Sequence, residues 1–561
     1  MGKKYVFLES KTKKIVPAIR EGGENHALHS LFDPEREAAR LLDAVKNKGF
    51  VIFLGLGGGF FVREALKRNI SLVLVIDFDR EGAAEIFAAV PDVLLGENGK
   101  KAHILIDPSN AEIERFILDH YHPVLMDGVQ CLPLRPRTRV DATAFKDAED
   151  AVAKAIEKVA VDFSVQSAFG LRWFSNILHN MKRLMANAAT LADAEAPLPK
   201  VKHAAVVAAG PSLDGQIPLL RKFKETQGFV IAVDTAFPRL AREGVEPDAI
   251  ISIDCQIWTY HHFRGRVPKN TLLLFALEGG VIDAGERIRF FAGGHPFSRY
   301  ISRFVYPLPE IDASGGNVTY AAVSLAETLG AETTTLYGAD FSYPFGKTYA
   351  RGTWLYDFYG NRSNRFQSAE TRFSDLLYRT PLEKKESPLK DGWYYETPAL
   401  AMYRRRLEEK TWRTKLIPFP TAESGDAVYN ASPEKNRAST SKESEEIRHD
   451  LQRASLSAPL RLNDYFEKVR ALSFDNLDEE SALILATILP IMTSFKRRKS
   501  DTSKEALLDM TKTFIKGIYF EEKERKREKS EEEGLTKRER YDILREDGRG
   551  RESVNIWQGE G

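Results

Sequence analysis

Short apolar runs alternate with amphipathic stretches through the middle of the chain, over residues 201–429. The clearest runs read VVAAG, FVIAVDTA, AIISIDCQ, TLLLFAL and TTTLYGAD. Apolar runs of this length, bounded by glycine and polar residues, are typical of buried parallel strands, and the stretches between them are typical of helices. The alternation predicts a doubly wound, Rossmann-like α/β domain with a mostly parallel sheet and helices on both faces.

A similar pattern occurs near the start of the chain. FVIFLGLGGGFFVREAL covers residues 50–66 and ISLVLVIDFDREG covers residues 70–82, which predicts a Rossmann-like domain with a glycine loop between strand and helix. Asp77 and Asp79 end the second strand, as an acid does in a dinucleotide or S-adenosylmethionine site. Because the glycine spacing is loose and no catalytic motif follows, a domain that serves assembly or packing is the favoured alternative.

Helices are predicted on both sides of the central domain. Residues 464–499 and 502–522 are expected to be helical, and a tail dense in charges of both signs follows them. Before the central domain, FGLRWFSNILHNMKRLMANA places apolar residues at helical spacing for core packing, namely Phe169, Trp173, Ile177, Leu184 and Met185. The expected organisation is a Rossmann-like domain at 1–160, a central domain at 161–430 with a helical connector at 161–200, and a charged helical domain at 431–561.

The charge balance argues against one broad class of partner. The 561 residues carry 81 Lys and Arg against 80 Asp and Glu, a net charge of +1, so no overall basic field favours nucleic acid. Cys131 and Cys255 are too few for a disulfide scaffold or a cysteine-based zinc site, and they fit a reducing compartment. No apolar run reaches the roughly 20 residues of a membrane span, and the first residues have no apolar signal core. We expect a cytoplasmic protein with no membrane span.

The first run of the central domain continues into AAGPSL, a candidate nucleotide-binding turn. Gly210 lets the backbone turn sharply and approach a ligand closely. Pro211 suits a first helical turn, Ser212 can cap the helix, and Leu213 starts its amphipathic stretch. Free amide groups at such a helix start attract phosphate. The alternative is a tight turn without a ligand, as in any doubly wound sheet.

Polar residues follow several of the predicted strands. Ligands of such sheets bind beyond the carboxyl ends of the strands. Each of these residues alone is more often a cap or a turn residue, but their repetition predicts one shared site. They are Ser212, Asp234, Thr235, Asp254, Gln256 and Asp340.

Longer motifs resemble one family over most of residues 162–429. The chain contains, in this order, FGLRWFSNILHN, VVAAGPSLDGQIPLL, FVIAVDTAFPRLAREGVEPDAIISIDCQ and SGGNVTYAAVSLAETLGAETTTLYGADFSYPFGKTYARGT. It thereby resembles the motility accessory factor (Maf) glycosyltransferases of flagellated bacteria, whose three-part organisation also suits the two ends of the chain. The related and shorter archaeal MptE-like pterin pyrophosphokinases share only the motifs of the central domain.

The resemblance implies an inverting transfer of a nonulosonic acid, a sialic-acid-like sugar such as pseudaminic or legionaminic acid, from a CMP-activated donor. The acceptors would be Ser or Thr hydroxyls of flagellin in the cytoplasm, in a step that flagellum assembly and motility need. The CMP-sugar would be a co-substrate, and no further cofactor is expected. The C-terminal helices are the candidate contact for flagellin.

Central motifs also resemble those of bacterial sialyltransferases that use CMP-sialic acid, which implies residues that bind the nucleotide. The turn Gly210–Leu213 would contact the nucleotide itself. Ser314 and Gly315 resemble a serine-glycine turn near the phosphate, and Gly316 and Asn317 continue it. From the residues alone, a plain helix N-cap is an equal alternative for these four positions.

The segment GADFSYPFGKTYA resembles the part of the sialyltransferases that carries an aspartate and phosphate-contacting tyrosines. The candidate catalytic residues are therefore Asp340, Tyr343 and Tyr349. Tyrosine hydroxyls can donate hydrogen bonds to a departing phosphate without changing protonation. Tyr349 also belongs to an aromatic-rich loop, and this loop can simply pack as a lid or receive an apolar patch of flagellin.

No metal site is expected. A monophosphate leaving group such as CMP does not need the metal clamp commonly used for diphosphates. The sequence DCQ at Asp254 is not Asp-x-Asp, and the adjacent His261 and His262 do not share one face of a regular element. Asp234 is expected to bind the nucleotide, and Asp254 and Gln256 to contact its ribose or cytosine.

The general base for the acceptor stays open. The sialyltransferases use a histidine downstream of the tyrosine segment, but here no histidine lies between His295 and His449. Tyr349, Asp340, His295 or His262 could take the role. If bond breaking leads, the acceptor can also react with little help from a base.

Two other functions are kept as alternatives. An MptE-like 6-hydroxymethylpterin pyrophosphokinase would use ATP and magnesium, with Asp234, Asp254 and Asp340 as carboxylate ligands. A non-catalytic assembly factor would bind flagellin through a degenerate nucleotide fold. The length of the chain argues against a simple pterin kinase, and the intact motifs at 210–213 and 314–317 argue against a scaffold.

Overall fold

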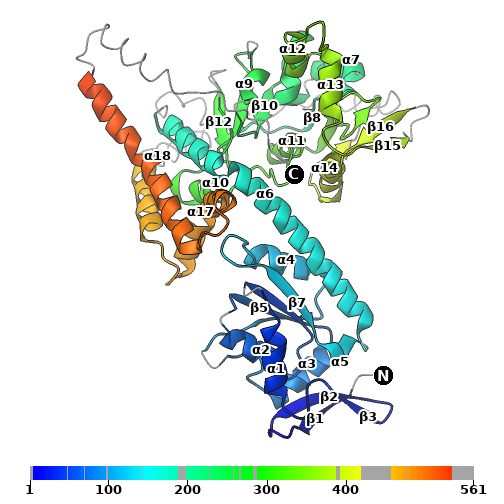
Figure 1. Cartoon of the computed structure of the whole chain (residues 1–561). Helices are drawn as coiled ribbons and strands as arrows, with labels where there is room; N and C mark the ends of the chain where they lie inside the picture. Colours follow the sequence, from blue (N-terminus) through cyan, green and yellow to red (C-terminus); the bar gives the residue numbers. More distant parts are fainter. Residues whose placement is uncertain are drawn as a thin grey trace. The chain divides into compact units, whose positions relative to one another are not determined.

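The computed structural model divides the chain into two compact units (Figure 1). The N-terminal unit consists of Met1–Leu171 with Ala486–Leu507, and the central unit of Arg172–Leu485 with Leu508–Gly561. The described residues are 4–46, 49–68, 70–96, 99–138, 140–186, 198–226, 228–256, 258–264, 267–281, 287–386, 392–417, 457–475 and 477–532.

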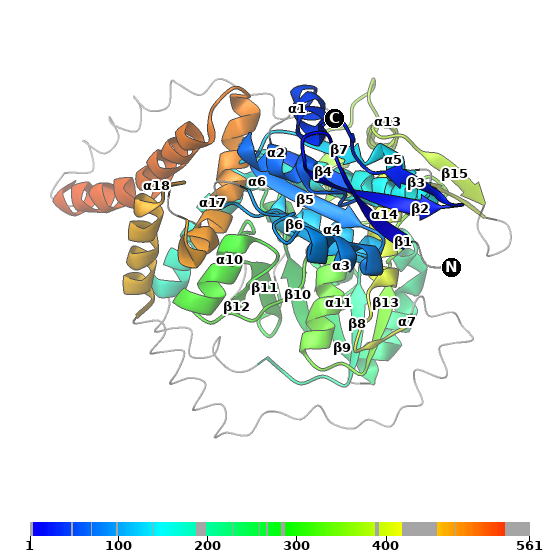
Figure 2. The same cartoon turned by 90° about the horizontal axis from the view of Figure 1, so that it is seen from below.

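The N-terminal unit contains the predicted parallel sheet and an antiparallel sheet that the sequence did not predict (Figure 2). Its strands are β1 Lys4–Glu9, β2 Ile15–Glu21, β3 Glu24–Ala27, β4 Phe50–Leu54, β5 Leu72–Asp77, β6 His103–Ile106 and β7 Val129–Pro133. Its first helices are α1 Pro34–Asp43, α2 Phe60–Lys67, α3 Arg80–Ala89, α4 Asn110–His120 and α5 Arg135–Thr138. The parallel sheet has the order β6-β5-β4-β7, and β1-β2-β3 form the antiparallel one.

Both faces of the parallel sheet are covered. Because successive side chains of a strand point to opposite faces, neighbours in β4 enter different cores. Val51 and Phe53 belong to one hydrophobic core, and Phe50, Ile52 and Leu54 belong to another. This is why the strand reads as an unbroken apolar run rather than an alternating one.

A buried ion pair links α5 to the carboxyl end of β5 in this unit. Arg137 in α5 is fully buried, and its Nη1 donates to both carboxylate oxygens of Asp77 at 2.9 and 2.7 Å. Its Nε and Nη2 donate to Asp141 Oδ2 at 3.0 and 2.7 Å. Asp77 also accepts the amide groups of Leu56 at 2.7 Å and Asp79 at 3.0 Å. The burial of these charges is therefore compensated by a complete set of partners.

Helix α6 Ala142–Ala186 begins about twenty residues before the predicted connector and contributes to both units. Its buried side chains in the central unit include Phe174, Ile177 and Met181. Ile177 and Leu184 are buried as predicted, whereas Trp173 and Met185 lie half-buried beside the apolar stripe. The rest of the predicted connector, residues 187–197, lies outside the described residues.

The central unit is built on seven parallel strands in the order β12-β11-β10-β9-β8-β13-β17 (Figures 1 and 2). They are β8 His203–Val207, β9 Phe229–Val233, β10 Ala249–Ser252, β11 Leu272–Ala276, β12 Ile288–Phe291, β13 Thr333–Tyr337 and β17 Lys415–Ile417. The five predicted strands are confirmed. The short β12 and β17 were missed because runs of three or four residues carry too little periodicity.

Helices and a small sheet complete the central unit. The helices are α7 Leu213–Glu225, α8 Phe237–Arg242, α9 Thr259–His262, α10 Pro296–Tyr300, α11 Val318–Thr328, α12 Trp354–Gly360, α13 Ala369–Leu377 and α14 Pro398–Glu409. A three-stranded antiparallel sheet has the order β14-β16-β15, with β14 Tyr343–Pro344, β15 Glu383–Glu386 and β16 Trp393–Glu396. Since β8 pairs with both β9 and β13, the direction of winding reverses between β8 and β13.

Helix α6 also fixes two loops beyond the large sheet. Asn176 Nδ2 donates to the carbonyl oxygens of Cys255 at 3.2 Å and Glu278 at 3.1 Å. The buried Asn180 donates to the carbonyl oxygens of Leu277 at 2.8 Å and Gly279 at 3.0 Å. These carbonyls follow β10 and β11, so the helix orders the backbone at the carboxyl edge of the sheet.

The helical region after residue 456 differs from its prediction in one respect. The single helix expected at 464–499 is wrong, because helix 457–471 ends before α17 Glu479–Arg498 begins. Asp478 caps the second helix through the amide group of Ser481 at 2.8 Å. The helix expected at 502–522 is confirmed as α18 Lys504–Glu532. The charged tail from residue 533 and the polar stretch 418–456 lie outside the described residues.

In the part of the chain that the structure describes, none of the helices combines the length and the apolar character needed to cross a bilayer.

We predict that Arg137→Met lowers the unfolding free energy of the N-terminal unit by about 3–5 kcal/mol, because the Asp77 carboxylate stays buried without its partner. The matched control is Lys158→Met, which breaks a partly exposed ion pair with Glu114 and should cost about 0–1 kcal/mol. Urea unfolding followed by circular dichroism measures both. Equal losses in the two variants would contradict the role given to the buried pair.

Candidate functional site

The turn Gly210–Leu213 lies at the point where the winding of the large sheet reverses. It leaves the carboxyl end of β8 and packs against the segment that leaves β13. The Gly210 amide group donates to the Gly338 carbonyl oxygen at 2.8 Å. Gln216 Oε1, one helical turn further on, accepts the Gly338 amide group at 2.8 Å. The crevice beyond this reversal point is where open α/β sheets bind ligands.

Asp340 is placed directly on the start of helix α7. Its Oδ2 accepts the backbone amide group of Ser212 at 2.9 Å. Burial raises the pKa of the Asp340 carboxyl, and the contact with Ser212 opposes this shift. The predicted cap by the Ser212 side chain is wrong, since Ser212 Oγ is buried and makes no hydrogen bond within the described residues. A carboxylate 128 residues away in sequence takes that role.

The sequence predicted free amide groups at the start of α7 that would attract phosphate. This prediction is wrong, because these amide groups already donate hydrogen bonds within the chain. Besides Ser212, the amide groups of Leu213, Asp214 and Gly215 donate to the carbonyl oxygens of residues 210, 211 and 212 at 3.1–3.2 Å. A tight turn and one internal carboxylate therefore satisfy this helix start. Any phosphate at this edge needs donors from other elements.

Gly210 is required by the closeness of Asp340. A Cβ at this position would lie 2.2 Å from Asp340 Oδ2 and 2.4 Å from the Gly338 carbonyl oxygen. Both distances are far inside van der Waals contact, and Gly338 O belongs to the backbone. The sequence correctly singled out Gly210, although the close approach is to the chain's own carboxylate.

Two further predicted acids follow β9 and β10. The buried Asp234 accepts hydrogen bonds from Thr235 N and Oγ1 at 2.6 and 3.0 Å and from Ser252 Oγ at 2.7 Å. Asp254 Oδ1 accepts the Gln256 amide group at 2.9 Å. Burial raises the pKa of the Asp254 carboxyl, and the nearby charge of Asp234 adds to the increase. The two carboxylates therefore lie close together at the sheet edge.

The segment after β13 folds back over the same edge. The Ala350 amide group donates to the Ala209 carbonyl oxygen at 2.9 Å. Tyr349 lies beside Tyr343 and Asp234, and burial together with these neighbours raises the pKa of its phenol to about 12. Burial also raises the pKa of Tyr343. The phenol of Tyr349 is thus a hydrogen-bond donor over the physiological pH range.

This segment contains two strained positions. Phe341 and Phe345 have φ values of 45° and 51°. A left-handed backbone is unfavourable for a bulky side chain and persists where the surroundings impose it. The strain brackets Tyr343, which pairs with Tyr395 in the small sheet.

The predicted turn Ser314–Asn317 forms the start of helix α11. Asn317 Oδ1 accepts the Tyr320 amide group at 3.0 Å, so the N-cap alternative is confirmed for Asn317. Gly316 adopts a φ of 79°, and Ser314 is exposed. The amide groups of Val318 and Thr319 precede the first bond inside the helix. Because helices between parallel strands run back along the sheet, this start lies at the carboxyl edge.

A charged contact fixes the approach to this turn. Asp312 Oδ1 accepts the Ser314 amide group at 2.9 Å, and Oδ2 accepts from Lys410 Nζ at 2.7 Å. These hydrogen bonds lower the pKa of the Asp312 carboxyl to about 2, against the effect of burial. Arg406 Nη1 donates to the Ser314 carbonyl oxygen at 3.2 Å. Helix α14 therefore holds the turn from one side.

The two histidines considered as a base have different surroundings. His295 caps α10, where its Nδ1 accepts the Phe297 amide group at 3.1 Å, and burial lowers its pKa to about 3. His262 is buried near Asp254, and its Nδ1 has no hydrogen-bond partner within the described residues. Of the two, only His262 lies with the candidate acids.

Two polar side chains of this edge were missed by the sequence analysis. Gln216 belongs to the quoted motif DGQIPLL, but nothing in the motif shows that its amide faces β13. Ser252 lies inside a strand, where an apolar-run analysis treats it as an interruption. Within the described residues, no group of three or more His, Cys, Asp or Glu side chains is placed to hold a metal ion.

In the glycine loop of the N-terminal unit, backbone amide groups donate to side chains of the chain itself. The Leu56 amide group donates to Asp77, and the Gly58 amide group donates to Nε2 of the buried His29 at 2.9 Å. Asp79 caps α3 through the Gly82 amide group at 2.9 Å. The two acids thus fold the loop and the next helix, which agrees with the packing alternative.

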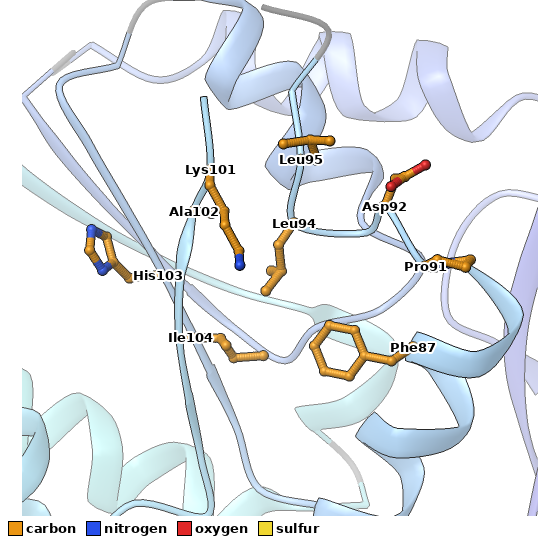
Figure 3. Close-up of a pocket in the computed structure, with 9 residues that line it drawn as sticks. All are labelled: Phe87, Pro91, Asp92, Leu94, Leu95, Lys101, Ala102, His103 and Ile104. Atoms are coloured by element: carbon orange, nitrogen blue, oxygen red, sulfur yellow. The ribbon is translucent and has the colours of Figure 1, made fainter. Parts of the chain in front are cut away.

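A cavity of about 690 Å³ lies elsewhere in the N-terminal unit (Figure 3). Lys101, Ile104, Leu94 and Phe87 point toward one another there, whereas Asp92 points away. The lining residues come from the end of α3 and the start of β6. This is the amino edge of the parallel sheet, opposite to the edge where such sheets bind ligands.

Comparison with known proteins finds a family for part of the chain. Residues 175–346 match the family model of 6-hydroxymethylpterin diphosphokinase MptE-like proteins. An uncharacterized protein of Treponema pallidum (strain Nichols) is 40% identical over 127 residues, which cover 23% of this chain and 44% of that protein. A second uncharacterized protein of the same organism is 27% identical over 161 residues, covering 29% of this chain and 74% of that protein.

The chain covers less than half the length of the first of these relatives. Among solved structures, the Maf glycosyltransferase from Magnetospirillum magneticum AMB-1 is 12% identical with a TM-score of 0.46. That comparison covers 92% of this chain and 86% of the other.

We predict that Gly210→Ala destabilises the central unit by at least about 2 kcal/mol, because the new methyl group must displace Asp340 or the Gly338 backbone. The matched control is Gly215→Ala inside α7, where a Cβ would meet nothing within 4 Å and should stabilise by about 0.5–1 kcal/mol. Thermal unfolding of both variants measures the difference. A Gly210→Ala protein as stable as wild type would rule out the close contact.

Proposed function

We propose that the chain is a glycosyltransferase that moves a nonulosonic sugar from a CMP-activated donor to Ser or Thr hydroxyls of flagellin in the cytoplasm. The observation that carries this proposal is the gathering of predicted site residues at the carboxyl edge of β8 and β13. There the half-buried Asp340 holds the first turn of α7, and the segment that carries Tyr349 folds back over the same edge. The motifs at this edge resemble those of the Maf glycosyltransferases, and this resemblance is the basis for naming the CMP-activated donor and the flagellin acceptor.

The leaving phosphate needs stabilisation as the sugar centre becomes oxocarbenium-like. Because the start of α7 is already occupied, we assign the phosphate to the turn Ser314–Asn317 and the first amide groups of α11. We assign the Ser212 hydroxyl and the Tyr349 phenol as further donors at the same edge of the sheet. Such fixed donors act on charge that grows during the reaction and need no proton transfer.

Asp340 is a positioning residue in this proposal. Its carboxylate holds the Ser212 amide group at 2.9 Å and thereby sets the turn that faces the nucleotide. Asp254 and Gln256 are assigned to the ribose or cytosine, and Asp234 ties the end of β9 to Ser252 at the end of β10. His262 is the candidate base for the acceptor hydroxyl, since its free Nδ1 lies near these groups. No metal ion takes part in this scheme.

A second candidate function is favoured by the family match at 175–346. A pterin diphosphokinase would bind ATP with magnesium, which prefers carboxylate oxygens. Asp254 is the acid best suited to this role. Asp234 already accepts three hydrogen bonds from Thr235 and Ser252, and Asp340 is engaged with Ser212.

We expect calorimetric titration of the whole chain to show CMP binding that persists in EDTA, because a monophosphate can be held by amide and hydroxyl donors alone. Replacing Ser314 by Ala should weaken CMP about tenfold, the loss of a hydrogen bond to a charged group. Ser363→Ala, a change just after α12 where Ser363 Oγ donates to the Tyr359 carbonyl oxygen, is the control. Binding of ATP only with magnesium, and none of CMP, would favour the diphosphokinase.

We also predict that Tyr349→Phe lowers the rate of sugar transfer by about 10- to 100-fold while CMP affinity changes little, because the phenol acts on charge that develops in the transition state. Its pKa of about 12 means that its donor role should not change between pH 6 and 9. Tyr356→Phe, which removes the hydroxyl that donates to the Tyr349 carbonyl oxygen, is the matched control. An equal rate in wild type and Tyr349→Phe would remove this assignment.

A further inference from the structure

A second cavity of about 360 Å³ lies in the central unit, beyond the carboxyl ends of β9 and β10. Helices α8, α9 and α12 supply its lining, in which Phe237, Arg242, His261, His262, Arg264 and Trp354 take part. Helix α9 follows Asp254 within a few residues, and Thr259 Oγ1 donates to the Asp254 carbonyl oxygen at 3.3 Å. The cavity is therefore adjacent to the candidate nucleotide residues but formed by different side chains.

One wall of this cavity is a stack of flat rings. His261 lies on Trp354 with ring centroids 5.0 Å apart and an angle of 12° between the planes. Trp258 lies nearly parallel to both, with centroid distances of 5.5 Å to His261 and 6.2 Å to Trp354. Flat aromatic faces of this kind bind planar rings or the apolar C–H face of a sugar.

The lining of the cavity has a positive charge left over after Arg242 and Asp357 neutralise each other. Arg242 Nη2 donates to both carboxylate oxygens of Asp357 at 2.7 Å, so the acid in the lining is already neutralised. Arg264 is exposed and makes no hydrogen bond or ion pair within the described residues. Arg362 lies over the Phe358 ring at 3.7 Å and adds a second cation nearby. A ligand that carries an anion would meet an available guanidinium here.

A buried polar atom also points to a ligand. His262 is more than nine-tenths buried, lines the cavity, and its Nδ1 has no hydrogen-bond partner in the described part of the chain. Leaving such a group unpaired is unfavourable, because it loses its hydrogen bonds to water without replacement. A hydroxyl or amide group of a bound molecule would satisfy it.

We propose that this cavity is a subsite for a carboxylated sugar, with the carboxylate on Arg264 and a sugar face on Trp354, beside His262, whose free Nδ1 is the candidate base for the acceptor hydroxyl. The inference rests on the proposed function, because it assigns the acidic sugar of the donor to a place apart from its nucleotide. It makes Arg264 the residue that selects acidic over neutral sugars.

The test uses the full chain and free N-acetylneuraminic acid as the probe, with its methyl ester as the uncharged match. Of the six tryptophans, Trp354 lines the cavity and Trp258 stacks against Trp354, so their fluorescence reports binding. We expect the acid to bind at least tenfold more tightly than the ester. Arg264→Met should abolish this preference, whereas Arg413→Met, at a distant exposed arginine, should keep it.

Trp354→Leu provides a second variant, and it should weaken the acid and the ester by a similar factor because it removes the stacking face rather than the charge. Circular dichroism of each variant checks that it is folded. Equal binding of acid and ester by wild type, or tighter binding of a pterin, would overturn the subsite.

Titration with CMP separates this inference from the proposed function. CMP binding together with no preference for the acid overturns the subsite alone. Preference for the acid without CMP binding keeps the subsite and overturns the donor nucleotide.

Discussion

The contact between the Asp340 carboxylate and the Ser212 amide group is the constraint on which the central unit depends. It joins the turn after β8 to the segment after β13 across the point where the sheet reverses its winding. The contact requires a glycine at 210, fixes the first turn of α7, and leaves the Tyr349 segment to fold over the same edge. Removing any one of these parts would change the backbone at this edge of the sheet.

In each unit, a carboxylate of the chain accepts a backbone amide group from the turn between a strand and the next helix. In the N-terminal unit, Asp77 accepts an amide group of the glycine loop, and Arg137 together with His29 completes the closure. In the central unit, Asp340 accepts one amide group of the first turn of α7, and carbonyl oxygens of the turn itself accept the next three. In both units the chain therefore satisfies amide groups that could otherwise bind a phosphate.

Much of the fold could be predicted from the sequence, because buried parallel strands leave apolar runs such as those that became β4, β5 and β8 to β11. The polar residues at their ends were also predictable as a group. The partners of these residues were not, because Asp340 meets Ser212 and Asp77 meets Arg137 only after long segments fold between them. The cavity at Arg264 was equally hidden, since helices after β9, β10 and β13 each contribute one part of it.

The strained backbone at Phe341 and Phe345 has a consequence for the segment between them. A left-handed φ is unfavourable for phenylalanine, so the surroundings of these residues, rather than local backbone preference, hold the conformation. The position of Tyr343 therefore depends on that packing, which includes the contact of the Phe345 ring with Trp393.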